Sequence, residues 1–359
     1  MITGTTAFQY LKGQPPNQIY IKPGHYYYQF RLHEVSAFFK ASWLKNFDSL
    51  VLISEVTNTL HPDITVRSLH TVKAIERNQA FQLGIRTNLT NWLPARSTDS
   101  IKIIIKYMGI RSSPVKDLLM HLEQAGLVAT LSALEPEWKV ALKVSNVVGK
   151  LTSHLLQEGT VQELFSITQQ FNVSKLKTGY YAAWRCLDNE VFPSSLSLNS
   201  HKQLVNGSPP RPVKSCSYVI LQIHAIERLG VEILRHEPWW QLLQVSKDEI
   251  MYECELDDSL SPEKAKGITK QWQDTLRQVK KMLRADKGYL LSEGSDVIRA
   301  ASYEVSKKLR SSKILQSFGL ELLPTEWQHL LGVSTFEELQ KSAENYQDAL
   351  QWSQAQQVN

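Results

Sequence analysis

The spacing of apolar residues changes near the middle of this 359-residue chain. Before about residue 225, apolar side chains alternate with polar ones, as in strands that bury one face. After that point they recur every three or four residues, as on the buried face of a helix. Because one element cannot satisfy both periods, we expect two parts: a strand-rich α+β domain over 1–225 and an α-helical domain over 226–359.

Segments of the first part carry clear strand signals. In Tyr26–His33, the side chains at even positions are aromatic or apolar, and those at 29, 31 and 33 are polar. This pattern predicts a half-buried strand. Three further runs, rich in β-branched residues or alternating in polarity, lie at 49–54, 64–70 and 101–108. Short strands at this spacing predict an antiparallel, β-sandwich-like domain or a small barrel.

Two segments interrupt this strand pattern. Residues 113–172 carry helix signals, which include Pro114 at a first helical position and a capping box formed by Thr160 and Glu163. Strand character then returns, so we expect a helical insertion in the first domain. The Pro/Ser/Asn-rich stretch at about 188–216 contains few apolar residues, and this composition predicts a flexible loop.

Capping signals predict several helices in the second part. Their expected positions are a start at Pro238, a span of 262–285, a cap at Ser295, a start at Thr325, and a terminal helix capped by Ser334 and Glu337. Trp239, Trp240, Trp272 and Trp327 lie in this part, either in its core or as anchors of a protein interface.

The terminal helix carries a narrow apolar seam with coiled-coil spacing. An isolated helix of this length is marginal in water, so the seam must be buried, either against the preceding helices or against a partner or second copy. The predicted partner-binding residues are Phe336, Leu339, Tyr346, Leu350 and Trp352.

Basic residues concentrate just before that helix. Between Lys264 and Lys313 the chain has 13 Lys or Arg against 5 Asp or Glu. Within this block, one helix face carries the predicted anion-binding residues Lys270, Arg277, Lys281 and Arg284. Such a face is either simply solvated or suited to an anionic membrane or to nucleic-acid phosphates.

The sequence contains no pattern that identifies a reaction. Phosphate-binding glycine loops, a serine-hydrolase elbow, HExxH and zinc spacings are missing, so we expect no cofactor, metal or catalytic residue. Three widely spaced cysteines favour a reducing compartment. With no signal peptide and no transmembrane segment in the sequence, they predict a cytoplasmic protein.

Function is therefore ranked by elimination. The leading hypothesis is a non-enzymatic intracellular binding or assembly protein, an adaptor or structural component that works through its helical domain. The first alternative is a peripheral membrane- or nucleic-acid-binding protein that uses the basic helical face. The second is an enzyme whose site is assembled from scattered residues.

Overall fold

The computed structural model describes residues 6–11, 18–37, 47–58, 61–74, 81–83, 87–111, 161–186, 196–201, 203–213, 216–256, 261–285, 288–311 and 323–358. Its internal contacts define two compact units. Unit 1 comprises 1–23 and 28–225, and unit 2 comprises Gly24–Tyr27 and 226–359. Antiparallel sheets and helices together confirm the mixed α and β composition, with the helices mostly in the C-terminal half. The predicted domain arrangement stays a prediction.

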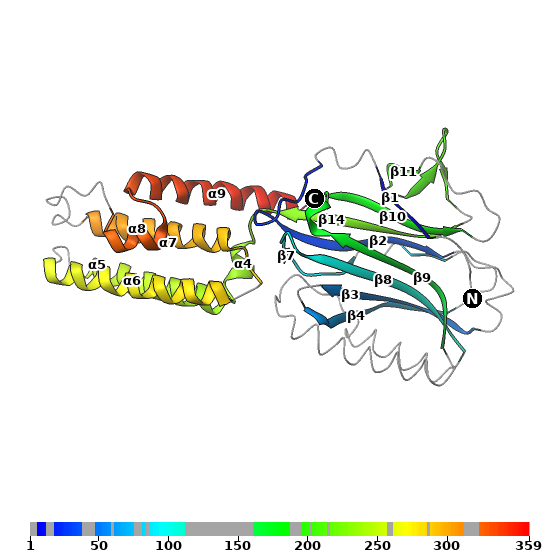
Figure 1. Ribbon diagram of the computed structural model, residues 1–359, viewed down its shortest axis with the longest axis horizontal. Coiled ribbons are helices and arrows are strands. Elements are labelled where there is room, and N and C mark those ends of the chain that lie inside the picture. Colours follow the sequence, from blue (N-terminus) through cyan, green and yellow to red (C-terminus); the bar gives the residue numbers. More distant parts are fainter. Residues whose placement is uncertain are drawn as a thin grey trace. The chain divides into compact units, whose positions relative to one another are not determined.

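Unit 1 contains two large sheets, most of whose strands are labelled in Figure 1. The first has the order β1-β10-β14-β2-β5, with β6 and β7 also paired to β2. Its strands are β1 (Thr6–Leu11), β2 (Tyr27–Ala37), β5 (Phe81–Leu83), β6 (Thr87–Asn88), β7 (Leu93–Pro94), β10 (Gly179–Cys186) and β14 (Cys216–Ile226). The second has the order β4-β3-β8-β9 and comprises β3 (Ser49–Asn58), β4 (His61–Ala74), β8 (Ser100–Ile110) and β9 (Val161–Asn172).

The predicted strands at 49–54, 64–70 and 101–108 are confirmed, but the expected helix that begins at Thr160 is wrong. Residues 161–172 form β9, which pairs with β8 along its whole length. From Phe165 onward, its buried side chains Phe165, Ile167 and Phe171 keep the period of two that suits a strand, and the buried Leu164 lies at a register shift in the β8–β9 ladder. The rest of the predicted helical insertion, 113–160, lies outside the described residues.

Phe171 of β9 joins the two sheets. Its ring lies 5.3 Å from Phe8, 4.8 Å from Phe30 and 5.9 Å from Tyr181, all on the first sheet. Edge-on and tilted aromatic pairs at these distances add to the stabilisation that burial provides. Packing of the sheets as a sandwich over their full faces stays a prediction.

Strand β2 is buried on both faces, which corrects the expected half-buried strand. Gln29 and His33, on the parity predicted to face solvent, are both buried. The His33 ring packs edge-on against Tyr180 at 5.1 Å. A strand in the middle of a covered sheet satisfies its polar side chains internally, and alternation along the sequence does not distinguish such a strand from a half-exposed one.

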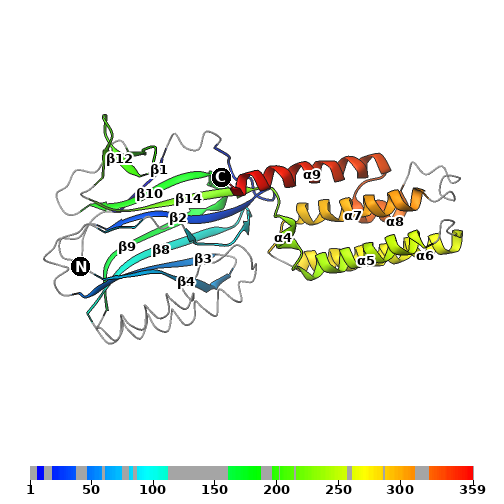
Figure 2. The same cartoon turned by 180° about the vertical axis from the view of Figure 1, so that it is seen from behind.

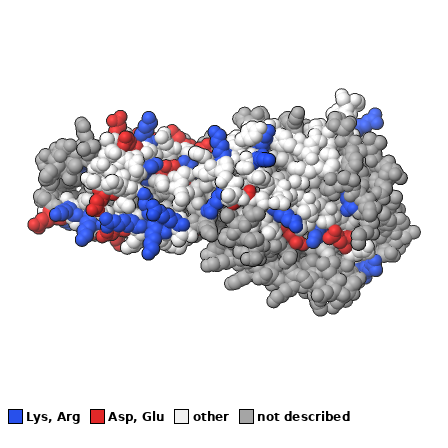
Figure 3. Space-filling model, viewed as in Figure 1, with Lys and Arg blue, Asp and Glu red and all other residues white. Residues whose placement is uncertain are grey.

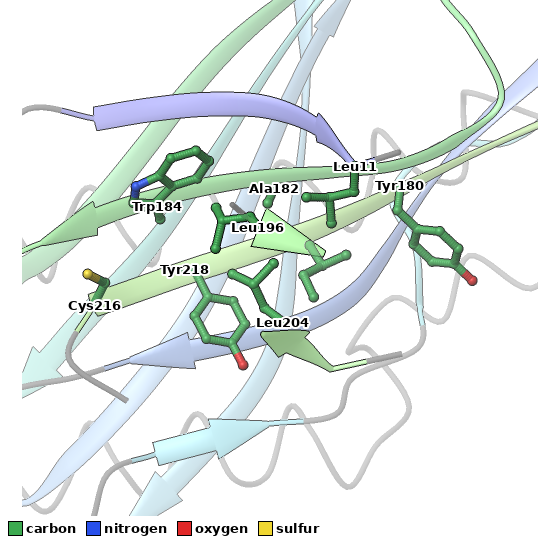
Figure 4. Close-up of a cluster of buried hydrophobic side chains, with 9 residues drawn as sticks. Leu11, Tyr180, Ala182, Trp184, Leu196, Leu204, Cys216 and Tyr218 are labelled. Atoms are coloured by element: carbon green, nitrogen blue, oxygen red, sulfur yellow. The ribbon is translucent and has the colours of Figure 1, made fainter. Parts of the chain in front are cut away.

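A third, small sheet corrects the predicted flexible loop at 188–216. It consists of β11 (Leu196–Leu198), β12 (Leu204–Asn206) and β13 (Arg211–Pro212). Leu196 and Leu204 belong to a buried cluster with side chains of β1, β10 and β14, including Trp184 and Tyr218 (Figure 4). Low apolar content predicts disorder for an isolated segment. Here two leucines are enough to order the segment, because they pack against the apolar face of an existing sheet.

The sequence predicts reduced cysteines, but one of them forms a disulfide. Cys216, the first residue of β14, is disulfide-bonded, and Cys186 lies directly opposite it in the β10–β14 ladder. Cys254 is free and buried. The expected reducing, cytoplasmic location gains no support from this disulfide and stays a prediction.

Unit 2 consists of helices, and the long ones run side by side in Figures 1 and 2. They are α4 (Val231–Leu234), α5 (Pro238–Glu255), α6 (Pro262–Ala285), α7 (Leu291–Ser311), α8 (Thr325–Leu331) and α9 (Phe336–Val358). The predicted starts at Pro238 and Thr325 and the predicted span of 262–285 are confirmed. Among the residues described, no helix combines the length and apolar content that crossing a membrane requires.

Two predicted caps are misplaced. Ser295 lies inside α7, where its hydroxyl donates to the Leu291 carbonyl. The box before α9 is shifted by one residue: the Glu338 amide donates to the Thr335 hydroxyl, and the Thr335 amide donates to the Glu338 carboxylate. Hydrogen bonds from the Ser334 and Thr335 amides to the carboxylate hold the pKa of Glu338 below its ordinary value. Ser334 with Glu337 and Thr335 with Glu338 both have the spacing of a capping box, so only the turn geometry distinguishes the two registers.

The third sheet provides a test of the correction at 188–216. Leu204→Ala should lower the free energy of unfolding of unit 1 by about 2–5 kcal/mol, because it leaves a cavity over β10 and β14. Ser200→Ala, at an exposed turn position, should change it by less than about 0.5 kcal/mol. Denaturation followed by tryptophan fluorescence measures both, and equal small effects would favour a flexible loop.

Candidate functional site

A buried carboxylate organises the end of unit 2 that includes Gly24–Tyr27. Glu293, in the first turn of α7, accepts a hydrogen bond from the Tyr27 hydroxyl at 2.5 Å and one from the Leu229 amide at 2.7 Å. The Tyr27 hydroxyl in turn accepts from the Leu290 amide at 2.8 Å. The Ser292 hydroxyl donates to the Gly24 carbonyl. One side chain therefore connects three chain segments that are distant in sequence.

Burial dominates the electrostatics of this site. It raises the pKa of Glu293 to about 7, although the hydrogen bonds from Tyr27 and Leu229 and the nearby Arg228 oppose the rise. Burial and the Glu293 carboxylate together raise the pKa of Tyr27 well above its ordinary value. Tyr27 thus stays a neutral donor, and Glu293 changes its charge near neutral pH.

Charged and polar groups surround the carboxylate. Arg228 forms an ion pair with Asp296 at 2.6 Å, and Asp296 also pairs with Arg299 at 3.3 Å. Burial raises the pKa of Tyr346, and the Glu293 carboxylate adds to that rise. The buried Tyr346 hydroxyl has no hydrogen-bond partner among the described residues. Tyr346, predicted from sequence as a partner contact, therefore lies beside this network.

A carboxyl group that titrates near 7 next to a tyrosine resembles a general acid–base pair. However, Glu293 is only 1 % exposed, so a substrate cannot contact it in this structure. Among the described residues, no group of three or more His, Cys, Asp or Glu side chains could hold a metal ion. We therefore assign the Glu293 network to stability.

Replacing Glu293 should remove a pH dependence of stability. The folded pKa of about 7 exceeds the ordinary value of 4.5, so the folded state binds the proton more tightly. Stability is therefore lost as pH rises from about 4.5 to about 7. Glu293→Gln cannot ionise, and its free energy of unfolding should gain up to about 3 kcal/mol relative to wild type across this window. Urea denaturation at several pH values measures the difference, and parallel profiles would contradict the assignment.

The predicted partner-binding seam lies within unit 2. Leu339, Tyr346 and Leu350 are buried, and α9 packs along α7. Phe336 is half-buried; its ring lies 5.2 Å from Tyr303 and beneath the Arg310 guanidinium at 4.0 Å. The side chain of Trp352 lies outside the described part of the chain. These contacts favour burial against the preceding helices, and a partner role for the seam stays a prediction.

Leu339 tests the role of the seam. Leu339→Ala should lower the free energy of unfolding by about 2–5 kcal/mol, because the side chain is fully buried. Gln347→Ala, on the exposed face of the same helix, should change it by no more than about 0.5 kcal/mol. Thermal denaturation followed by circular dichroism compares the two variants. An unchanged melting temperature for Leu339→Ala would favour a partner-binding role for the seam.

Three tryptophans of unit 2 belong to its core, while Trp240 is half-buried. Trp239, Trp272 and Trp327 are buried. The Trp272 indole donates to the Ser302 hydroxyl at 3.1 Å, and Trp239 packs edge-on against Tyr289 at 5.9 Å. Large aromatic side chains at these positions fill the space between helices, so these three tryptophans are not available as interface anchors.

The four predicted anion-binding residues all lie on α6 and are exposed. Arg277 pairs with Asp274 and with Glu326 of α8, each at 3.1 Å. Lys270, Lys281 and Arg284 have no ion-pair partner among the described residues. Figure 3 shows blue side chains gathered over the part of unit 2 where α5 and α6 lie. The structure thus brings these four residues together on one face, as predicted.

Sequence reasoning missed an exposed apolar face on α5. Val245 near the middle of α5, Tyr252 in its last turn and the C-cap residue Leu256 are 57 %, 62 % and 68 % exposed. Their spacing of seven and four residues was visible in the sequence, but the nearby tryptophans and leucines define a stronger stripe on the opposite face. Glu293 was also missed, because no local pattern distinguishes a buried glutamate from the usual exposed one.

No protein-family model, curated protein or solved structure matches this chain. The proposals below therefore rest on the chain's own geometry.

Proposed function

We propose that this protein is a non-catalytic binding or assembly component that contacts a protein partner, or a second copy of itself, through unit 2. The contact surface is the α5 strip, defined as Val245, Tyr252 and Leu256. The exposure of these three large apolar side chains on one helix face is the observation that carries the proposal. Scattered exposed apolar residues are ordinary, whereas an aligned group marks an interaction surface more often.

The surroundings of the α5 strip indicate the chemistry of the partner. Asp248 and Glu249 are exposed one turn from Val245, and Glu255 lies next to Leu256. Glu255 is partly neutralised by Lys308, whose ammonium lies 3.3 Å away. An apolar strip with acidic neighbours fits a partner with apolar anchors and basic residues at the rim.

The proposal moves the leading hypothesis to a different helix. The seam of α9 was the expected interface, but its leucines contribute to the interior of unit 2. Burial of an apolar face inside a unit leaves little of it for a partner. The α5 strip is a better candidate, since a partner there would remove apolar surface from water without opening the helical unit.

Substitution of the strip tests the proposed interface. The variant Tyr252→Ser with Leu256→Ser should keep its melting temperature, because both side chains are exposed. It should lose any assembly or partner shown by the wild type. Val231→Ser with Leu291→Ser removes two other exposed apolar side chains of unit 2 and serves as the control.

Light scattering over a concentration series measures self-association, and tagged capture with mass spectrometry compares partners. Loss in the strip variant and retention in the control would support the proposal. If all three proteins have the same mass and capture the same partners, the α5 strip is not the interface.

A further inference from the structure

Five cationic side chains share one face of α6. Lys266, Lys270, Arg277, Lys281 and Arg284 are exposed, and their intervals of 4, 7, 4 and 3 residues align them on one side of the helix. Along a helix axis, the first and last of these residues are separated by about 27 Å. The face therefore matches an extended anion better than a small one.

Among the described residues, most of this charge has no carboxylate partner. Arg277 is paired with two carboxylates, but Lys270, Lys281 and Arg284 have no ion-pair partner in the described part of the structure. Lys280, at the edge of the face, has its pKa lowered by burial and then by the Arg284 and Arg299 guanidiniums. Cations crowded in this way leave a positive potential that attracts polyanions.

The other residues of this face argue against a membrane surface or single-stranded nucleic acid as the partner. Glu263, Gln273 and Asp274 share the face, and none of the exposed large apolar side chains of the described residues lies on α6. A helix that binds a membrane surface places apolar side chains in the headgroup layer. Binding of single strands depends on aromatic side chains that stack on bases. The α6 face offers neither.

We propose that the α6 face, defined as Lys266, Lys270, Arg277, Lys281 and Arg284, binds the phosphate backbone of double-stranded nucleic acid. Lysine and arginine contacts to phosphates position a protein on a duplex without reading its sequence. Binding is therefore sequence-independent and decreases steeply with salt. This inference does not rest on the α5 strip, since it uses a different helix and a different chemistry.

The test compares the binding of full-length wild type and variants to a duplex of about 20 base pairs over a range of salt concentrations. The face variant carries Lys270→Gln, Lys281→Gln and Arg284→Gln. The matched control carries Lys175→Gln, Arg211→Gln and Lys341→Gln, which removes the same charge from exposed positions outside α6. Circular dichroism confirms folding, and Lys270→Arg with Lys281→Arg keeps the charge as a further control.

Wild type and both controls should bind with the same steep salt dependence. In the face variant, binding should weaken, and the slope of log K against log salt should fall by about 2.7, or about 0.9 for each lost phosphate contact. Arg277→Gln alone should change the slope less than Lys281→Gln, because Arg277 is already paired.

Several results would overturn the proposal. The first is no wild-type binding even at about 50 mM salt. The second is an equal loss in the face variant and the matched control, which would reflect net charge alone. The third is a preference for single strands or for anionic lipid vesicles over the duplex, which would assign the face to another class of anion.

Discussion

Unit 2 depends on the burial of a single carboxylate. Glu293 is surrounded by protein, yet it is held by the Tyr27 hydroxyl and the Leu229 amide, which come from segments far apart in sequence. An isolated buried charge is costly, and hydrogen bonds to its oxygens offset part of that cost. The remaining cost appears as a pKa raised to about 7. The network therefore fixes where Gly24–Tyr27 joins the helices, and part of that stability depends on pH.

Once the interior of unit 2 is packed, its surface contains two distinct regions. Trp239, Trp272, Trp327 and the α9 leucines are used in the core, where they exclude water between the helices. Among the described residues, the apolar strip of α5 and the cationic face of α6 stay exposed. We propose that the first contacts a protein with a basic rim and that the second binds phosphates.

Much of the secondary structure was predictable because it follows local rules. The starts of α5 and α8 were marked by Pro238 and Thr325, and the full span of α6 by its apolar period. The cations of α6 were also placed correctly, since one helix fixes their relative positions. Predictions failed where a segment depends on distant neighbours: β9 needs β8 as its partner, and Leu204 needs the apolar face of β10 and β14.

The sequence by itself determined the starts of α5 and α8, the span of α6 and the charges along α6, because these depend on residues within a few helical turns. Only the tertiary structure decided which apolar faces are used in the core and which stay exposed. It also decided that Glu293 is buried beside Tyr27, although 265 residues lie between them. Burial is a property of packing between segments, and a local pattern carries no information on which segment will cover it.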